Sequence, residues 1–196
     1  MDVPRLDLGH VTLRELSEAD LPTISQAADD PYIELLSGLV PGDADSAKAY
    51  LRRQALRAER DLGLSLAITE TATDRAVGQI GLWLRAVAPD GSTGYLEEAH
   101  GRAALGYWIL PAERRKGFAT TALNALSTWA LALDDIERLE VFIEPANKPS
   151  WRAAERAGYH REGTLRSWQK IGDSRRDMYL YSRLPEDAGE DMAVGR

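Results

Sequence analysis

Three cations stand together just before a stretch that is typical of a helix. The segment RRKGFATTAL, residues 114–123, places Arg114, Arg115 and Lys116 before Gly117 in a chain of net charge −7. The first turn of a helix has free N–H groups and a partial positive charge, so cations are locally unfavourable there. A bound anion would remove this conflict, and the segment therefore predicts a phosphate site. A solvated turn is the alternative for the three charges taken alone.

The neighbouring residues restrict which phosphate ligand the turn can serve. A predicted strand and the turn residue Pro111 come before the cations, and the small Gly117 and Ala119 would let a phosphate approach the backbone closely. The nucleotide pattern GxxxxGK(S/T) does not occur, and no GxGxxG follows a predicted strand. The predicted anion is therefore neither the phosphate of a P-loop nucleotide nor that of a dinucleotide.

The composition excludes several other kinds of site. The 196 residues include no cysteine, which excludes disulfides, thiolate nucleophiles and cysteine-bound metals. The three histidines, His10, His100 and His160, are far apart and lack HExxH spacing, so we expect no metal. The acidic balance argues against nonspecific nucleic-acid binding, and no apolar stretch approaches the roughly 18 residues of a membrane span. The N-terminal residues do not form a signal peptide, and we expect a cytoplasmic protein.

The order of predicted elements indicates a mixed α/β fold. Apolar residues alternate in the strands and recur every three or four positions in the helices. Strands are predicted at 11–16, 64–69, 76–87, 102–110 and 138–145, helices from Ser17 and at 45–61, 117–135 and 150–158, and a closing hairpin at 159–184. The helix between 102–110 and 138–145 makes these two strands parallel, because a parallel pair needs a crossover connection.

Two long segments are predicted to connect these elements. Residues 29–43 form an apolar loop that either packs on the core or flanks an acceptor site, and residues 88–101 form a hairpin tip with an Asp-Gly turn. We expect a single domain over residues 1–184. The acidic segment 185–196 is predicted to be a disordered tail.

Two motif blocks resemble the GNAT superfamily of N-acetyltransferases. The family's coenzyme A pyrophosphate signature, (R/Q)-x-x-G-x-(G/A), is matched by Arg114–Ala119, inside LGYWILPAERRKGFATTAL, which is similar to the family's strand–turn–helix unit. A second family pattern, N-x-x-S followed after seven residues by G-(F/Y), is matched by Asn147, Ser150, Gly158 and Tyr159. The Asn-x-x-Ser form and the ending DMYLYSRL resemble the RimJ/RimL-like branch, which includes protein N-terminal acetyltransferases.

The resemblance implies a GNAT-like fold and acetyl-CoA as cosubstrate, without a metal. A central mixed sheet with flanking helices would contain a splayed parallel pair, 102–110 and 138–145. The free edge of the first strand would pair with the pantetheine arm, as unpaired strand edges readily do. Asn147 would contact the same arm. The implied cofactor-binding residues are Tyr107, Trp108, Ile109, Leu110, Arg114, Arg115, Lys116, Gly117, Phe118, Ala119, Thr120, Asn147 and Ser150.

The implied reaction is direct attack of a primary amine on the thioester. It needs a neutral amine, a donor to the developing oxyanion and an acid for the departing thiolate. The backbone N–H of Ile109 is the expected oxyanion donor. Many superfamily members use a tyrosine as the acid, seven residues after the Asn, but this chain has Ala154 there. Ser150 is the predicted replacement, and a role in capping the helix is its alternative.

The base that receives the amine proton is sought among acidic residues near the predicted strand ends. Glu97 and Glu98 are the predicted catalytic carboxylates, with His100 and Glu144 as further candidates. Each of them would otherwise be an ordinary solvated charge. Trp168 is a candidate wall of the acceptor site, and a packing role is its alternative.

The predicted function is an acetyl-CoA-dependent N-acetyltransferase acting on a protein N-terminus or a small-molecule amine. We expect a monomer or homodimer, without nucleic-acid or membrane partners. The missing tyrosine at Ala154 leaves a non-catalytic acyl-CoA-binding module as one alternative. Use of another acyl-CoA by the same fold is a second alternative.

Overall fold

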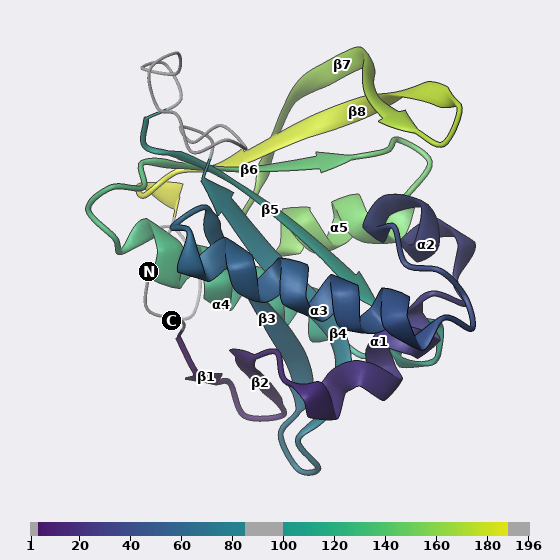
Figure 1. Ribbon diagram of the computed structural model, residues 1–196. Helices are drawn as coiled ribbons and strands as arrows, with labels where there is room; N and C mark the ends of the chain where they lie inside the picture. The colour runs from purple at the N-terminus through teal and green to yellow at the C-terminus, as the bar shows by residue number, and fades with distance from the viewer. Residues whose placement is uncertain (1–3, 85–99, 188–196) are drawn as a thin grey trace. The chain divides into compact units, whose positions relative to one another are not determined.

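The described residues, 4–84 and 100–187 of the computed structural model, form the predicted mixed α/β fold (Figure 1). Eight strands form one sheet in the order β1-β2-β3-β4-β5-β6-β8-β7. The strands are β1 (Leu6–Asp7), β2 (Val11–Glu15), β3 (Gly63–Glu70), β4 (Arg75–Leu84), β5 (Arg102–Ile109), β6 (Arg138–Ile143), β7 (His160–Ile171) and β8 (Ser174–Arg183). The helices are α1 (Leu21–Ala27), α2 (Pro31–Ser37), α3 (Ala44–Glu59), α4 (Phe118–Leu131) and α5 (Lys148–Arg156), with short 3-10 turns η1 (Glu18–Asp20) and η3 (Pro111–Glu113).

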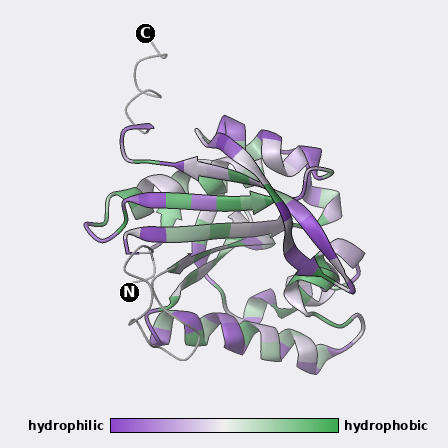
Figure 2. Cartoon of the chain, turned by 90° about the horizontal axis from the view of Figure 1, so that it is seen from above, coloured by the Kyte–Doolittle hydropathy of each residue, from purple (hydrophilic) through white to green (hydrophobic). Residues whose placement is uncertain are grey.

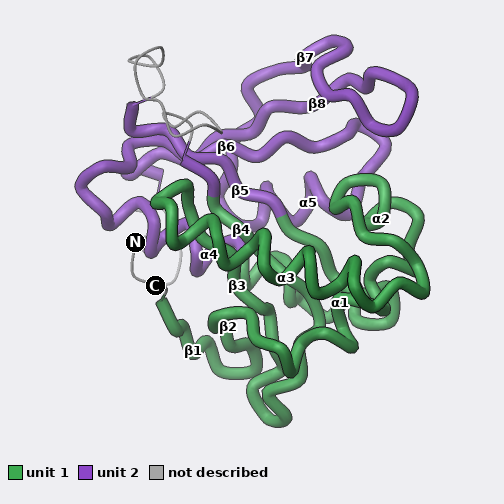
Figure 3. The backbone as a smooth tube through the Cα atoms, viewed as in Figure 1, with its two compact units in different colours: residues 1–82, 107–122 green, residues 83–106, 123–196 purple. Residues whose placement is uncertain are grey.

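The chain divides into two compact units (Figure 3). The first comprises residues 1–82 and 107–122, and the second comprises 83–106 and 123–196. The single domain expected over 1–184 therefore stays a prediction. Nearly all of the expected hairpin tip 88–101, and all but the first three residues of the expected tail 185–196, lie outside the described residues.

In the first unit, three helices and the sheet build one apolar core. α1 packs on α3, and α3 packs on β3. Residues from α1, α2, α3 and the end of β5 meet in a cluster that is almost completely buried. Its members are Ile24, Ala27, Ala28, Ile33, Leu39, Ala47, Tyr50 and Leu110. Figure 2 shows hydrophobic and hydrophilic residues alternating around the long helix α3, as expected for a helix with one buried face.

The segment 29–43 is not a loop throughout, because it contains helix α2 (Pro31–Ser37), and the prediction there was wrong. The Asp30 side chain accepts hydrogen bonds from the N–H groups of Tyr32 and Ile33 at 2.9 and 3.1 Å, and Pro31 is the first helical residue. Gly38 ends the helix in the left-handed conformation, with φ 69°. These are standard helix start and stop signals, and they outweigh the apolar, loop-like composition.

The second unit contains the parallel pair that the crossover helix predicts. β5 pairs with β6 through Arg102–Ala104 and Arg138–Glu140, which confirms the parallel orientation. Among the described residues, this pairing stops at Ala104, so β5 continues beyond it without a β6 partner. The closing hairpin is also confirmed, since β7 pairs antiparallel with β8, and α5 contacts both β6 and β7.

Candidate functional site

The predicted phosphate turn has the backbone conformation that an anion site requires. The 3-10 turn η3 follows β5, and Arg115 and Gly117 then adopt positive φ angles of 67° and 88° before α4 begins at Phe118. Left-handed residues curve the chain so that successive N–H groups can converge on one anion. A Cβ added at Gly117 would meet no atom within 4 Å, so the space beside this glycine is open.

Two of the three cations in this turn are already paired with carboxylates. Arg114 Nη2 lies 2.7 Å from Asp30 Oδ2, and its Nε donates to the carbonyl oxygen of Ile109 at 3.1 Å. Lys116 Nζ lies 2.8 Å from Glu113 Oε2. Arg115 is exposed and forms no ion pair with any residue in the described ranges. Arg115 is therefore the cation of this turn whose charge is least compensated.

Both carboxylates have a pKa below the ordinary value. Burial acts to raise the pKa of Asp30, but the hydrogen bonds from the Ile33 N–H and from Arg114 outweigh it. Lys116 is the main cause of the lowered pKa of Glu113, and Arg75, 2.9 Å away, adds to it against the effect of burial. Both carboxylates therefore stay ionised near neutral pH and can keep their ion pairs with Arg114 and Lys116.

The end of β5 is held by a buried hydrogen-bond chain. Trp108 Nε1 donates to the Tyr50 hydroxyl at 3.1 Å, and this hydroxyl donates to Gln79 Oε1 at 2.5 Å. Tyr50 is only 4% exposed, and burial raises the pKa of its hydroxyl. The N–H of Leu110 donates to the carbonyl oxygen of Val77 on β4 at 2.9 Å. This part of the predicted cofactor strand is therefore rigidly positioned.

Sequence reasoning missed the residues that hold the turn and the strand: Asp30, Tyr50, Gln79 and Glu113. The partners of Asp30, Tyr50 and Gln79 are far away along the chain, so their spacing does not reveal them. Two local signals existed: an Asp before a Pro is a helix-start pattern, and Glu113 lies three residues before its partner Lys116.

In the second unit, the Asn-x-x-Ser motif forms the start of α5. Asn147 is its N-cap, and its side-chain oxygen accepts from the N–H of Ser150 at 3.3 Å. The cap uses the backbone of Ser150, which leaves its hydroxyl out of this contact. Within the described ranges the side-chain NH2 of Asn147 donates no hydrogen bond, so this group remains available to a ligand.

The position of the missing tyrosine is fully enclosed. Ala154 is 0% exposed on the buried face of α5. Two tyrosines of the second unit, Tyr159 and Tyr181, are also buried. The Tyr159 hydroxyl lies 2.7 Å from Ser127 Oγ, and the Tyr181 hydroxyl donates to Glu155 at 3.0 Å. Burial, followed by the Glu155 carboxylate, raises the pKa of Tyr181 to about 12. Neither phenol replaces the usual acid.

The remaining candidates are located as follows. Glu144 lies 3.7 Å from Arg176, which gives this carboxylate a structural partner. His100 is exposed, and Glu97 and Glu98 lie outside the described residues. Trp168 is 46% exposed and stacks on Phe142 with ring centroids 5.7 Å apart, so it is only partly used in packing.

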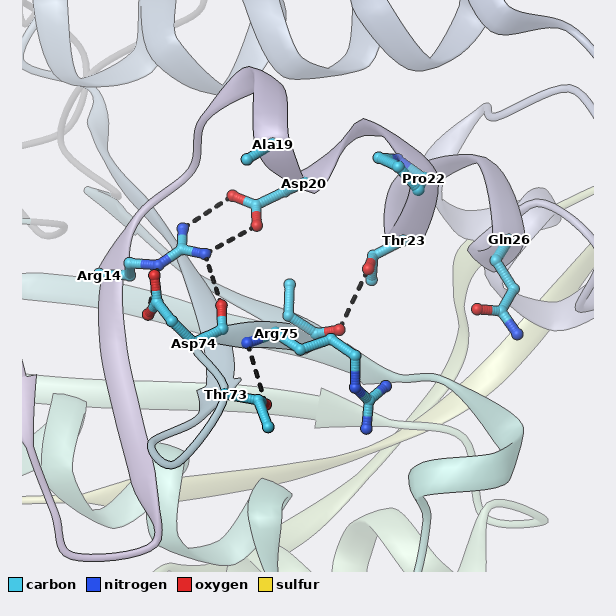
Figure 4. Close-up of a pocket in the computed structure, with 10 residues that line it drawn as sticks. Arg14, Ala19, Asp20, Pro22, Thr23, Gln26, Thr73, Asp74 and Arg75 are labelled. Carbon is cyan, nitrogen blue, oxygen red and sulfur yellow. Dashed lines mark hydrogen bonds and ion pairs between the residues drawn. The ribbon is translucent and has the colours of Figure 1, made fainter.

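A separate hollow of about 530 Å³ in the first unit is lined by polar side chains (Figure 4). Arg14 there forms two hydrogen bonds with Asp20, at 2.8 and 2.9 Å, and one with Asp74 at 3.0 Å. These partners raise the pKa of Arg14, with Asp20 the largest cause. Because the charges satisfy one another, we interpret the hollow as structural.

Two classes of site find no support in the described part of the chain. It contains no group of three or more His, Cys, Asp or Glu residues that could hold a metal ion. Among the helices of the described residues, none has the length and apolar content needed to cross a membrane.

Within the described residues, the sheet contains the parallel pair of β5 and β6, and a turn with two left-handed residues connects β5 to α4. The family model of the acetyltransferase (GNAT) domain matches residues 10–160, and the chain belongs to this family of N-acetyltransferases. N-acetyltransferase p20 of Bacillus licheniformis is 25% identical over 182 residues, covering 90% of this chain and 94% of that protein.

Solved structures show the same fold. RimJ of Mycobacterium smegmatis, in complex with CoA-disulfide, superimposes with a TM-score of 0.75 and 22% identity, covering 99% of this chain and 94% of that chain. RimL, a ribosomal L7/L12 alpha-N-protein acetyltransferase, gives a TM-score of 0.73 with 20% identity, covering 93% and 94%. The predicted resemblance to the RimJ/RimL-like branch is thus confirmed at the level of fold.

The ion pair between Asp30 and Arg114 makes stability depend on pH. A lowered pKa means that the Asp30 carboxylate stabilises the folded protein above its unfolded pKa of about 3.9, and that this contribution is lost as pH falls through the folded pKa. Asp30→Asn retains a capping side chain but removes the charge. We expect the variant to be about 1 kcal/mol less stable at pH 7, with the difference shrinking below about pH 4, in urea unfolding at a series of pH values.

Asp43→Asn is the matched control for this prediction. Asp43 also caps a helix, accepting from the N–H groups of Asp45 and Ser46 at 2.9 and 3.2 Å. We expect a smaller loss of stability at pH 7 than for Asp30→Asn. Equal and pH-independent losses in the two variants would show that the pair with Arg114 contributes nothing.

Proposed function

We propose that this N-acetyltransferase uses acetyl-CoA and transfers the acetyl group to a primary amine by direct attack on the thioester. The observation that carries the proposal is the open, left-handed turn at Gly117, directly before α4 in a chain of the GNAT family. RimJ was solved with CoA-disulfide, which supports coenzyme A as the carrier. Acetyl-CoA would supply the acetyl group already activated as a thioester.

The phosphate turn would bind the pyrophosphate mainly through backbone N–H groups. Arg114 forms an ion pair with Asp30, and Lys116 forms one with Glu113. Their role would be to shape the turn and to make its electrostatic potential more positive. Arg115 is the cation free to meet the phosphates directly. The free N–H groups of the first turn of α4 add the partial positive charge of the helix. The open side of Gly117 fits a group as bulky as a phosphate.

The pantetheine arm would follow the strand edge that β6 leaves unpaired. Among the described residues, the pairing of β5 with β6 ends at Ala104, and the edge of β5 beyond it would take the arm as an added strand-like partner. In the second unit, the NH2 group of Asn147 would donate to a carbonyl of the arm. Its side-chain oxygen is engaged in capping α5, so the amide is held in one orientation.

The chemical step assigns one task to each group. The attacking nitrogen forms a bond to the acetyl carbon while the carbon–sulfur bond breaks, and negative charge develops on the carbonyl oxygen. The N–H of Ile109 would stabilise this charge. The Ser150 hydroxyl would relay a proton to the departing thiolate, giving its own and taking one from water, and Glu97 or Glu98 would receive the amine proton.

The acceptor is a protein N-terminus or a small-molecule amine. The name of RimL states that it acts on the alpha-amine of a ribosomal protein, which supports a peptide acceptor for this chain. The exposed residues of α2 and the segment after it offer an apolar surface for such a peptide: Tyr32, Leu35, Leu36 and Val40. A cytoplasmic location and a monomeric or homodimeric state stay predictions.

Release of free thiol from acetyl-CoA is the direct test of the function. The assay should compare peptides with free N-termini, the same peptides with acetylated N-termini, and a panel of small amines. We expect thiol release with at least one free amine and none with its acetylated form. Binding of acetyl-CoA in calorimetry without turnover for any amine would instead support the non-catalytic acyl-CoA-binding module.

Gly117→Asp should strongly weaken acetyl-CoA binding. The carboxylate would stand in the open space beside the turn and would repel the pyrophosphate, and we expect affinity at least about 100-fold weaker in calorimetric titration. Gly42→Asp is the control, because Gly42 also has a positive φ, 73°, and open space around it. Equal affinities of the two folded variants would contradict a phosphate site at Gly117.

Ser150→Ala should lower kcat, by about 100-fold if its hydroxyl is the acid, while KM for acetyl-CoA stays constant. The substitution keeps the backbone N–H that the cap of α5 uses, so the helix start is preserved. Asn147→Ala, in contrast, should raise KM for acetyl-CoA. Wild-type kcat in Ser150→Ala would leave the serine as an ordinary residue of the helix.

A further inference from the structure

At Gly78, strand β4 approaches β5 more closely than a side chain would allow. A Cβ at this position would lie 2.7 Å from Ile109 Cδ1 and 3.2 Å from Ile109 Cα. It would lie even closer to the carbonyl oxygen of Trp108, at less than 3.0 Å, a distance that real Cβ atoms essentially never show. A side-chain tip can move aside, but a backbone carbonyl moves only if the strand moves. Gly78 is therefore a strict requirement of this contact.

The contact defines how the peptide between Trp108 and Ile109 is turned. Carbonyl groups that bond within a sheet lie near its plane, whereas side chains stand roughly perpendicular to it. The carbonyl oxygen of Trp108 occupies the place where a side chain of residue 78 would stand, so this peptide is rotated out of the plane. A trans peptide is planar, with its N–H opposite its C=O. The N–H of Ile109 therefore points away from Gly78.

Three anchors fix this rotated peptide, and two of them involve the neighbours of Gly78 on β4. On one side, the carbonyl oxygen of Val77 accepts from the N–H of Leu110 at 2.9 Å. On the other, Gln79 accepts from the Tyr50 hydroxyl that receives the Trp108 indole N–H. The third anchor is Arg114 of the phosphate turn, whose Nε donates to the carbonyl oxygen of Ile109.

We infer that Gly78 is a positioning residue of the acetyl transfer, because its missing side chain lets the Trp108–Ile109 peptide turn the Ile109 N–H toward the reacting carbonyl oxygen. The inference rests on the proposed function. An N–H that meets the charge developing in the transition state affects kcat far more than cofactor binding. Loss of one such donor costs on the order of 100-fold or more in kcat.

Gly78→Ala tests the inference. Its methyl group displaces the Trp108 carbonyl and rotates the Ile109 N–H, so we expect kcat to fall by about 100-fold while KM for acetyl-CoA changes little. Gly163→Ala, on β7, is the control, because its Cβ would meet no atom within 4 Å. This control should retain most of kcat.

A double variant separates the backbone effect from side-chain crowding. Ile109→Val removes the Cδ1 atom that the new methyl group would meet, but it leaves the carbonyl contact in place. Gly78→Ala/Ile109→Val should therefore regain stability without regaining kcat. Recovery of kcat to the level of Ile109→Val alone would overturn the inference, because simple crowding would then explain the loss.

The amide resonance of Ile109 gives a readout that needs no acceptor. In the ¹⁵N-labelled wild-type protein, the Ile109 N–H should shift between the complexes with CoA and with acetyl-CoA, since only the latter has the thioester carbonyl. In Gly78→Ala this difference should vanish while binding persists. A wild-type protein that binds neither compound would contradict the proposed function itself. A difference that survives in Gly78→Ala would contradict the role of Gly78 alone.

Discussion

The Arg114 guanidinium is the interaction on which the arrangement of the first unit depends. It joins Asp30, the N-cap of α2, to the carbonyl oxygen of Ile109 at the end of β5. These partners are 84 and 5 residues away along the chain. One planar group with several donors in fixed positions can serve both partners at once. The helix, the strand end and the start of the phosphate turn are thereby held together.

This arrangement explains how an acidic chain tolerates a cluster of cations before a helix. Asp30 and Glu113 neutralise Arg114 and Lys116 locally, and these ion pairs help to hold the turn. In the proposed function, the attraction for phosphate would come from oriented N–H groups and from Arg115. A preformed site of this kind needs little rearrangement when its ligand binds, and less of the interaction energy is spent on ordering the turn.

Helix α5 has no side chain that could act as an acid at the position of Ala154. The helix position that could carry a tyrosine acid is occupied by Ala154, which is completely buried. A polar group there would have to leave the core to reach a substrate, and burying it unpaired would be costly. The proposed mechanism therefore assigns the acid to Ser150, at the partly exposed start of α5.

The sequence determined those features whose physical cause is local. Alternating and helical apolar patterns predicted the main strands and helices, and Gly117 after three cations indicated the turn before α4. Even the missed helix α2 was locally encoded, by Asp30, Pro31 and Gly38. The apolar composition of the segment hid these signals.

Only the tertiary structure decided which groups meet across the fold. Tyr50 and Trp108 are 58 residues apart, and nothing in either segment specifies that their side chains share a hydrogen bond. The role of Gly78 also depends on a partner strand, because an isolated glycine in a strand indicates close backbone approach without naming what approaches. Local patterns depend on neighbours along the chain, whereas such contacts depend on how the strands and helices pack, and this is why packing alone decided them.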